Sequence, residues 1–125
     1  MLFCLTVNYT SQALNAMREN PNTNRREAVE QLLTAAGGKL VAMYGTAAEG
    51  PGALVILDAD PVAAAAMSGI AMSSGAVTNV KLTRLFSMDE VAGIRQKAAQ
   101  LRGSYKPPAA HLRLIFPAAS RDEPN

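Results

Sequence analysis

Apolar and polar residues alternate along residues 2–8 and 77–86, as they do in strands that bury one face of a sheet. Residues 39–44 and 53–58 also have the composition of strands. In the first strand, Phe3, Leu5 and Val7 are expected to face the core. Cys4, Thr6 and Asn8 are expected to lie on the opposite side. In the last strand, the expected core side is formed by Val80, Leu82 and Phe86. The opposite side is formed by Asn79, Lys81 and Thr83. The sequence therefore predicts four strands.

The residues that follow the first strand have the spacing of apolar positions that is typical of helices. Residues 11–17 can form a short helical piece, and Pro21 would end it because the residue before a proline avoids the helical conformation. Asn24 and Glu27 have the spacing of a capping box, which starts a second helix. The apolar face of that helix is formed by Val29, Leu32, Leu33 and Ala36. Gly37 readily adopts the left-handed conformation that closes helices, so we expect the helix to end there.

Two further helix starts are visible downstream. Asp60 precedes Pro61, which loses no needed hydrogen bond at the first helical position, so a helix is expected from Pro61 to about Ser74. Ser87 and Glu90 form another capping box and start a C-terminal helix. The apolar face of this last helix is formed by Val91, Ile94, Ala98 and Leu101.

The order of these elements is the split βαβ pattern of an α+β, ferredoxin-like βαββαβ fold. We expect a four-stranded antiparallel sheet with the strand order 4-1-3-2 and both crossover helices on one face. The chain then divides into a ferredoxin-like domain (1–87), a C-terminal helix (88–102) and a proline-rich tail (103–125). Within the tail, residues 111–116 can add an edge strand.

The second face of the predicted sheet has no helix to cover it. It stays partly apolar, because it holds either Leu54 and Ile56 or Val55 and Leu57. Half-apolar exposed faces favour association. We therefore expect a homodimer or higher homo-oligomer in which two such faces pack isologously, with a polar-lined cleft between or beside them.

Composition narrows the class of protein. The chain has 125 residues, 49% of them hydrophobic but only 5% aromatic, which is sufficient for one aliphatic core. The net charge of +2 is scattered without a basic stripe, which argues against nucleic acid. Cys4 is the only cysteine, and no apolar run approaches the roughly 20 residues that span a bilayer. We expect a soluble, cytoplasmic protein that binds no membrane.

Few residues offer catalytic or metal-binding chemistry. His111 is the only histidine and lies in the tail, which leaves neither a multi-histidine metal site nor a Ser-His-Asp arrangement in the core. N-capping explains Asp60, and inert packing in a strand explains Cys4. The loop Glu49–Gly52 lacks the strand-to-helix context of a phosphate-binding loop. We predict no metal and no cofactor, and we assign no catalytic residue.

Polar residues that share the uncovered face form the candidate ligand-binding site: Thr6, Asn8, Tyr44, Lys81 and Thr83. Lys81 in a partly desolvated cleft can hold a small anionic ligand or, with a lowered pKa, act as a base. The alternative is that Lys81 snorkels or pairs across the interface. Tyr9 can border the same cleft, or it can pack at its strand end with a hydrated hydroxyl.

Three segments, in this order, resemble the GYD-domain family. They are residues 7–10 (Val-Asn-Tyr-Thr), the helix end Ala-Ala-Gly-Gly-Lys-Leu40 leading into Tyr-Gly-Thr46, and residues 75–86. The resemblance covers roughly residues 1–90 and implies a dimeric α/β barrel from a family largely without an assigned activity. The family's Gly-Tyr-Asp signature at the start of the third strand is replaced here by Glu49–Gly52, so no functional residue carries over.

These observations favour an oligomeric small-molecule-binding or assembly module. By analogy of fold alone, the alternative is a cofactor-independent oxygenase- or isomerase-like enzyme with a pocket at the uncovered sheet face. A third reading is protein–protein interaction through the C-terminal helix and tail. Whether the protein is an enzyme is left open by the sequence.

Overall fold

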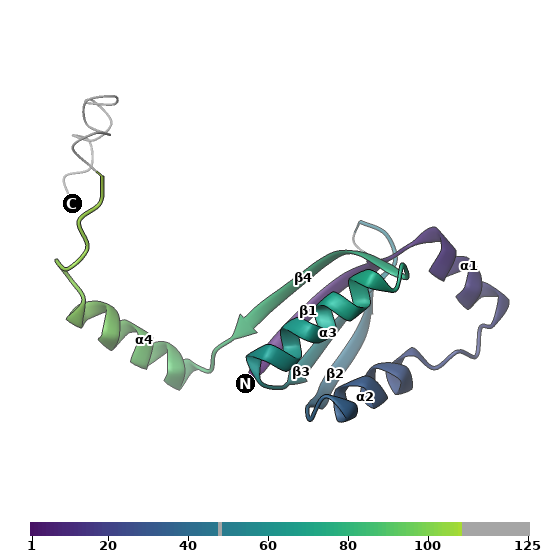
Figure 1. Cartoon of the computed structure of the whole chain (residues 1–125), viewed down its shortest axis with the longest axis horizontal. Coiled ribbons are helices and arrows are strands. Elements are labelled where there is room, and N and C mark those ends of the chain that lie inside the picture. Colours follow the sequence, from purple (N-terminus) through teal and green to yellow (C-terminus); the bar gives the residue numbers. More distant parts are fainter. Residues whose placement is uncertain (48, 109–125) are drawn as a thin grey trace. The chain divides into compact units, whose positions relative to one another are not determined.

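The computed structural model describes residues 1–47 and 49–108 (Figure 1). His111 and the predicted edge strand at 111–116 lie outside the described residues. The chain forms two compact units, Met1–Phe86 and a second that starts at Ser87. The helices and strands, in chain order, are β1 (Leu2–Tyr9), α1 (Ser11–Glu19), α2 (Arg25–Ala35), β2 (Lys39–Thr46), β3 (Gly52–Asp58), α3 (Pro61–Ser73), β4 (Val77–Leu85) and α4 (Met88–Gln100).

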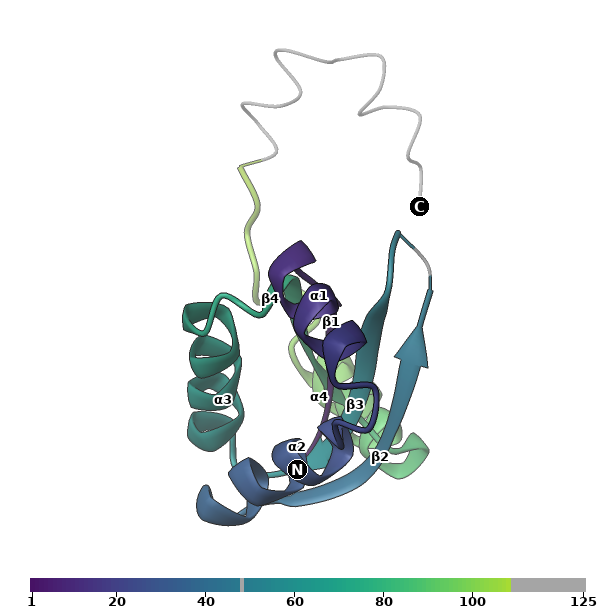
Figure 2. The ribbon, with the colours of Figure 1, turned by 90° about the vertical axis from the view of Figure 1, so that its right-hand side faces the viewer.

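The four strands form one antiparallel sheet in the order β2-β3-β1-β4. Figure 2 shows β2 and β3 running side by side as a hairpin. The predicted strand order and the ferredoxin-like α+β fold are confirmed.

The register of the sheet decides which residues share a face. Leu5 of β1 lies opposite Val55 on β3 and opposite Leu82 on β4. Residues directly opposite each other in a ladder point to the same side. Val55 therefore faces the helices with Leu5, and Leu54 and Ile56 lie on the other side, which decides between the two arrangements that the sequence allowed.

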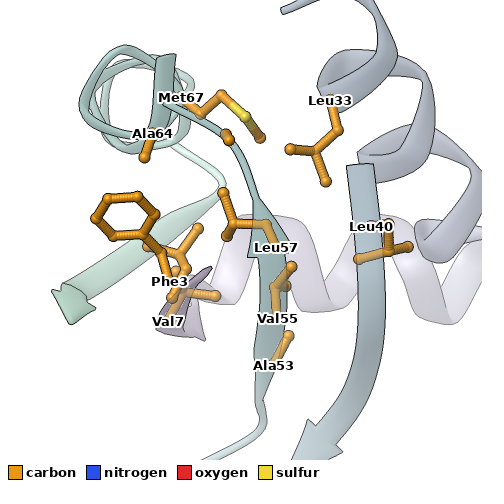
Figure 3. Close-up of a cluster of buried hydrophobic side chains, with 11 residues drawn as sticks. Phe3, Val7, Leu33, Leu40, Ala53, Val55, Leu57, Ala64 and Met67 are labelled. Atoms are coloured by element: carbon orange, nitrogen blue, oxygen red, sulfur yellow. The ribbon is translucent and has the colours of Figure 1, made fainter. Parts of the chain in front are cut away.

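The core lies between the sheet and helices α2 and α3 (Figure 3). Leu33 of α2 and Met67 of α3 converge above Leu57 of β3, and Leu33 and Leu57 are 0% and 1% exposed. Burying one such side chain stabilises a protein by about 1.5–3 kcal/mol. The buried apolar residues are Phe3, Leu5, Val7, Leu33, Leu40, Ala53, Val55, Leu57, Ala59, Ala64 and Met67. The predicted core side of the first strand is confirmed.

Side-chain caps fix where the helices begin. The Oδ1 atoms of Asn24 and Asp60 accept the backbone N–H groups three residues downstream, at 3.0 and 2.9 Å. Ser87 and Glu90 form a complete reciprocal capping box, with bonds of 3.1 and 2.8 Å. Thr10 caps α1 in the same way. The predicted N-caps at Asn24, Asp60 and Ser87 are confirmed, and the complete capping box is found at Ser87, whereas at Asn24 the structure shows the N-cap bond alone.

Several element ends differ from the prediction by one or two residues; strand β2, for example, continues to Thr46 instead of ending at Tyr44. Helix α1 continues to Glu19, two residues beyond the expected segment. Strand β4 ends at Leu85, so Phe86 is not part of the core side of the strand and is 48% exposed. The Arg84 guanidinium carbon lies 4.4 Å from the centroid of the Phe86 ring. This cation–π contact is the interaction that Phe86 makes in place of core packing.

Helix α4 belongs to the second unit and buries none of its residues within the described part of the chain. Its apolar side chains Met88, Ile94 and Leu101 are 76%, 46% and 57% exposed. Across residues 1–47 and 49–108, no helix has both the length and the apolar character needed to cross a membrane.

Candidate functional site

The sheet face opposite the core is called the open face below, and it carries Cys4, Thr6, Leu54 and Ile56. One row of residues crosses it from strand to strand. Thr6 lies opposite both Lys81 on β4 and Leu54 on β3, and Leu54 lies opposite Tyr44 on β2.

Of the predicted site residues, the structure brings Thr6 and Lys81 together, with Thr83 two positions further along β4 on the same face. Tyr44 lies on the same face but on β2, the edge strand at the opposite end of the sheet from β4. With strands about 4.8 Å apart, the backbones of Lys81 and Tyr44 are separated by roughly 14 Å.

The side chain of Asn8, the fifth predicted site residue, makes hydrogen bonds to other parts of the chain. Its Oδ1 accepts a hydrogen bond of 2.9 Å from the Asn79 side chain. Its Nδ2 donates long bonds of 3.5 and 3.4 Å to the backbone oxygens of Glu49 and Gly50. Asn79 lies where the β1–β4 register shifts and has a φ of 55°, a conformation that asparagine tolerates better than most residues. Asn8 thus ties the β2–β3 loop to this irregularity of β4.

A cavity of about 200 Å³ lies on the opposite side of the sheet, between the strands and helices α2 and α3. We call it the core cavity. All four strands and both helices contribute apolar walls. Its lining includes Tyr9, Arg25, Met67, Ile70, Ala71 and Ser74. None of the five predicted site residues lines this cavity.

Three polar side chains reach the lining of the core cavity. The Ser74 hydroxyl is already used, because it donates to the Ala71 oxygen at 2.7 Å and accepts from the Ala76 nitrogen at 3.1 Å. The Tyr9 hydroxyl and the Arg25 guanidinium make no hydrogen bond or ion pair with the residues that the structure describes. These two groups are the donors that a bound molecule would meet.

A second cavity of about 240 Å³ lies beside α1 and is called the α1 cavity. Its lining is formed by Tyr9, Ala13, Ala16, Met17, Asn20, Thr23, Arg25 and Ala76. Tyr9, Arg25 and Ala76 line both cavities. The β1 end and the first residue of α2 therefore form a wall that the two cavities share.

Sequence reasoning identified Tyr9 as a residue that can border a cleft, but it missed Arg25. Arg25 directly follows the cap Asn24, and in the sequence it is one of two adjacent arginines at the start of a surface helix. That position has no distinguishing signal until the cavity beside it is known. Among the described residues, no group of three His, Cys, Asp or Glu side chains is arranged to hold a metal ion.

A protein-family model described as GYD domain matches residues 3–94. The matched span includes the sheet apart from Leu2, helices α1 to α3 and the first half of α4. None of the curated proteins compared with the chain matches it. Because the model covers most of the sequence, the chain belongs to the GYD-domain family, and the resemblance seen in the sequence is confirmed.

Proposed function

From the premise of a GYD-domain chain with a ferredoxin-like core, we propose that the protein binds a small, mainly apolar molecule in the core cavity. The observation that carries this proposal is the cavity of about 200 Å³ between the sheet and helices α2 and α3, which opens to solvent where Arg25, Ile70 and Ser74 are exposed. An engineered apolar cavity of about 150 Å³ in another protein takes up benzene, so the available space suits a molecule slightly larger than one aromatic ring.

The lining favours binding over acid–base catalysis. Among the described residues around the core cavity there is no His, Cys, Asp, Glu or Lys side chain. General acid–base chemistry needs a group whose pKa lies near the working pH and which reaches the reacting atom. Apolar walls with a few convergent polar groups are instead typical of ligand sites.

The proposal is tested by filling the cavity from α3. Ala71 lines it, whereas Ala66 of the same helix is exposed and does not. We expect 3-phenylpropanol to shift the NMR signals of the Met67 and Ile70 methyl groups in a saturable way. Ala71→Leu should abolish these shifts, and the matched control Ala66→Leu should leave them unchanged.

Two results of this titration would overturn the proposal. The first is a wild-type protein whose Met67 and Ile70 methyl groups do not respond to the alcohol. The second is an Ala71→Leu variant, shown to be folded by its spectrum, that responds as the wild type does.

We further propose that the protein is a homodimer that pairs two open faces. The support is apolar surface left on this side of the sheet: Leu54 and Ile56 are only half-buried, and Tyr44, opposite Leu54 on the neighbouring strand β2, is 62% exposed. An isologous pairing would bury the same patch on both copies. A cytoplasmic location fits the single free cysteine, Cys4.

Light scattering during size-exclusion chromatography tests the dimer. We expect a wild-type mass of twice the chain mass, and a shift to the monomer for Leu54→Lys, which places a charge in the centre of the open face. Ala66→Lys on the exposed side of α3 should remain dimeric. A wild-type protein that stays monomeric at high concentration would contradict the proposed pairing.

For the open face we also propose a small anionic ligand beside Lys81. This proposal is supported by the register of the sheet, in which Lys81 lies directly opposite Thr6 on β1. Thr83 is two positions further along β4 and lies on the same face. In this proposal the ammonium group supplies the charge, and the two threonine hydroxyls supply hydrogen bonds.

A further inference from the structure

The core cavity and the α1 cavity share Tyr9, Arg25 and Ala76 as lining residues. Each cavity alone is smaller than the roughly 300–1,000 Å³ typical of small-molecule sites, whereas the two joined would fall within that range. Tyr9 and Arg25 are the polar side chains among the residues that line both cavities.

The two cavities differ in chemistry. The walls of the core cavity are almost entirely apolar. The α1 cavity adds the Asn20 and Thr23 side chains to the polar groups on the shared wall. The Thr23 hydroxyl is engaged, since it donates to the Asn20 backbone oxygen at 2.7 Å. The Asn20 carboxamide makes no side-chain hydrogen bond within the described residues and remains available.

Arg25 is the only charged residue among the described residues that line either cavity. Within that part of the chain its guanidinium has no ion-pair partner. It is also the first residue of α2, so the positive end of an 11-residue helix dipole adds to its charge. The linings of the two cavities therefore contribute a positive charge at the shared wall, and no carboxylate belongs to either lining among the described residues.

We propose that the two cavities are chambers of one site for a small amphipathic monocarboxylate. The apolar body of the ligand occupies the core cavity. Its carboxylate lies at the shared wall, where it accepts hydrogen bonds from the Arg25 guanidinium and the Tyr9 hydroxyl, and the Asn20 carboxamide faces it from the α1 cavity. A planar guanidinium matches the two oxygens of a carboxylate. This inference rests on the proposed binding function and adds the chemical class of the ligand.

The test compares 3-phenylpropanoate, 3-phenylpropanol and 3-phenylpropylamine by NMR titration of the full chain. The three probes share the same apolar body and differ in the charge of the head group. We expect the acid to bind the wild type at least about tenfold more tightly than the alcohol, and the amine more weakly than either. Hydrogen bonds to charged groups account for a factor of about 10–100.

Three variants assign that preference to residues. Arg25→Gln should weaken binding of the acid about 10- to 100-fold and leave the alcohol almost unchanged, since only the acid pairs with the guanidinium. Tyr9→Phe should weaken binding of the acid several-fold. Arg26→Gln is the matched control, because this neighbouring arginine lines neither cavity, and it should behave as the wild type.

The outcomes separate this inference from the function on which it rests. If none of the three probes binds, the proposed function fails together with the inference. If the alcohol binds as tightly as the acid, or if Arg25→Gln weakens the acid and the alcohol equally, binding in the core cavity stands and the carboxylate site is overturned. An effect of Arg26→Gln equal to that of Arg25→Gln also overturns it, because general surface charge would then explain the preference.

Discussion

The two faces of the sheet are built from alternate residues of the same strands, yet they differ in what covers them. On β1, the core-side residues Phe3, Leu5 and Val7 are 6%, 8% and 9% exposed, while Cys4 and Thr6 between them are only half-buried. Helices α2 and α3 cover the first face. One strand thus contributes both to a closed core and to a surface of mixed chemistry.

Strand β3 makes the comparison sharper. Val55 and Leu57 are 4% and 1% exposed on the core side, but the residues of the other face, Leu54 and Ile56, are also aliphatic. A strand with one solvated face normally alternates apolar and polar residues. The open face of β3 therefore carries apolar surface that the core of a single chain does not require, which supports a partner on that side.

The largest expected effect separates these two faces on β3. Leu57→Ala should lower the free energy of unfolding by about 2–5 kcal/mol, because it leaves a void where the Leu57 side chain is fully buried on the core side of the sheet. The loss should be the same at every protein concentration. Urea denaturation followed by circular dichroism measures it.

Ile56→Ala is the matched variant on the open face. If two open faces pair, its effect on unfolding should depend on protein concentration, since dimerisation stabilises the folded chain by mass action. An effect of Ile56→Ala as large as that of Leu57→Ala and independent of concentration would show instead that the open face is covered within the chain itself.

The faces of β1 were predictable from the sequence, but those of β3 were not. Thr6 and Asn8 interrupt the apolar residues of β1 and reveal its period of two. Residues 54–57 are aliphatic without interruption, so either parity fits. Only the cross-strand register, in which Val55 lies opposite Leu5, decides the question.

A smaller effect is expected at Gly52, the first residue of β3. A Cβ added at Gly52 would lie 2.1 Å from the Val7 backbone oxygen. Gly52→Ala should destabilise the protein by about 3 kcal/mol, the upper end for overpacking, because backbone rather than a flexible side chain must move. Thermal unfolding of the variant measures the loss.

Gly69 supplies the control for this substitution. It lies in helix α3 with nothing within 4 Å of an added Cβ. Gly69→Ala should raise the free energy of unfolding by about 0.5–1 kcal/mol through its better helix propensity. A Gly52→Ala variant as stable as the wild type would mean that β1 and β3 can separate there without cost.

The candidate sites were predictable to different degrees for a physical reason. The neighbourhood of Thr6 and Lys81 follows from strand order and parity, which sequence pattern determines well. The core cavity depends instead on how α2 and α3 pack on the sheet, which the period of the apolar residues does not specify. Arg25 was missed because its role depends on that packing.

The smallest effect on stability is expected at Lys81, an exposed side chain on the open face. Lys81→Ala should change the free energy of unfolding by no more than about 0.5 kcal/mol, as is usual for surface substitutions. Its effect on ligand binding should be larger: inorganic phosphate should raise the melting temperature of the wild type but not that of Lys81→Ala. The control is Lys39→Ala, which removes an exposed lysine at the start of β2. If both variants lose the response to phosphate equally, net charge explains it and the open face holds no anion site at Lys81.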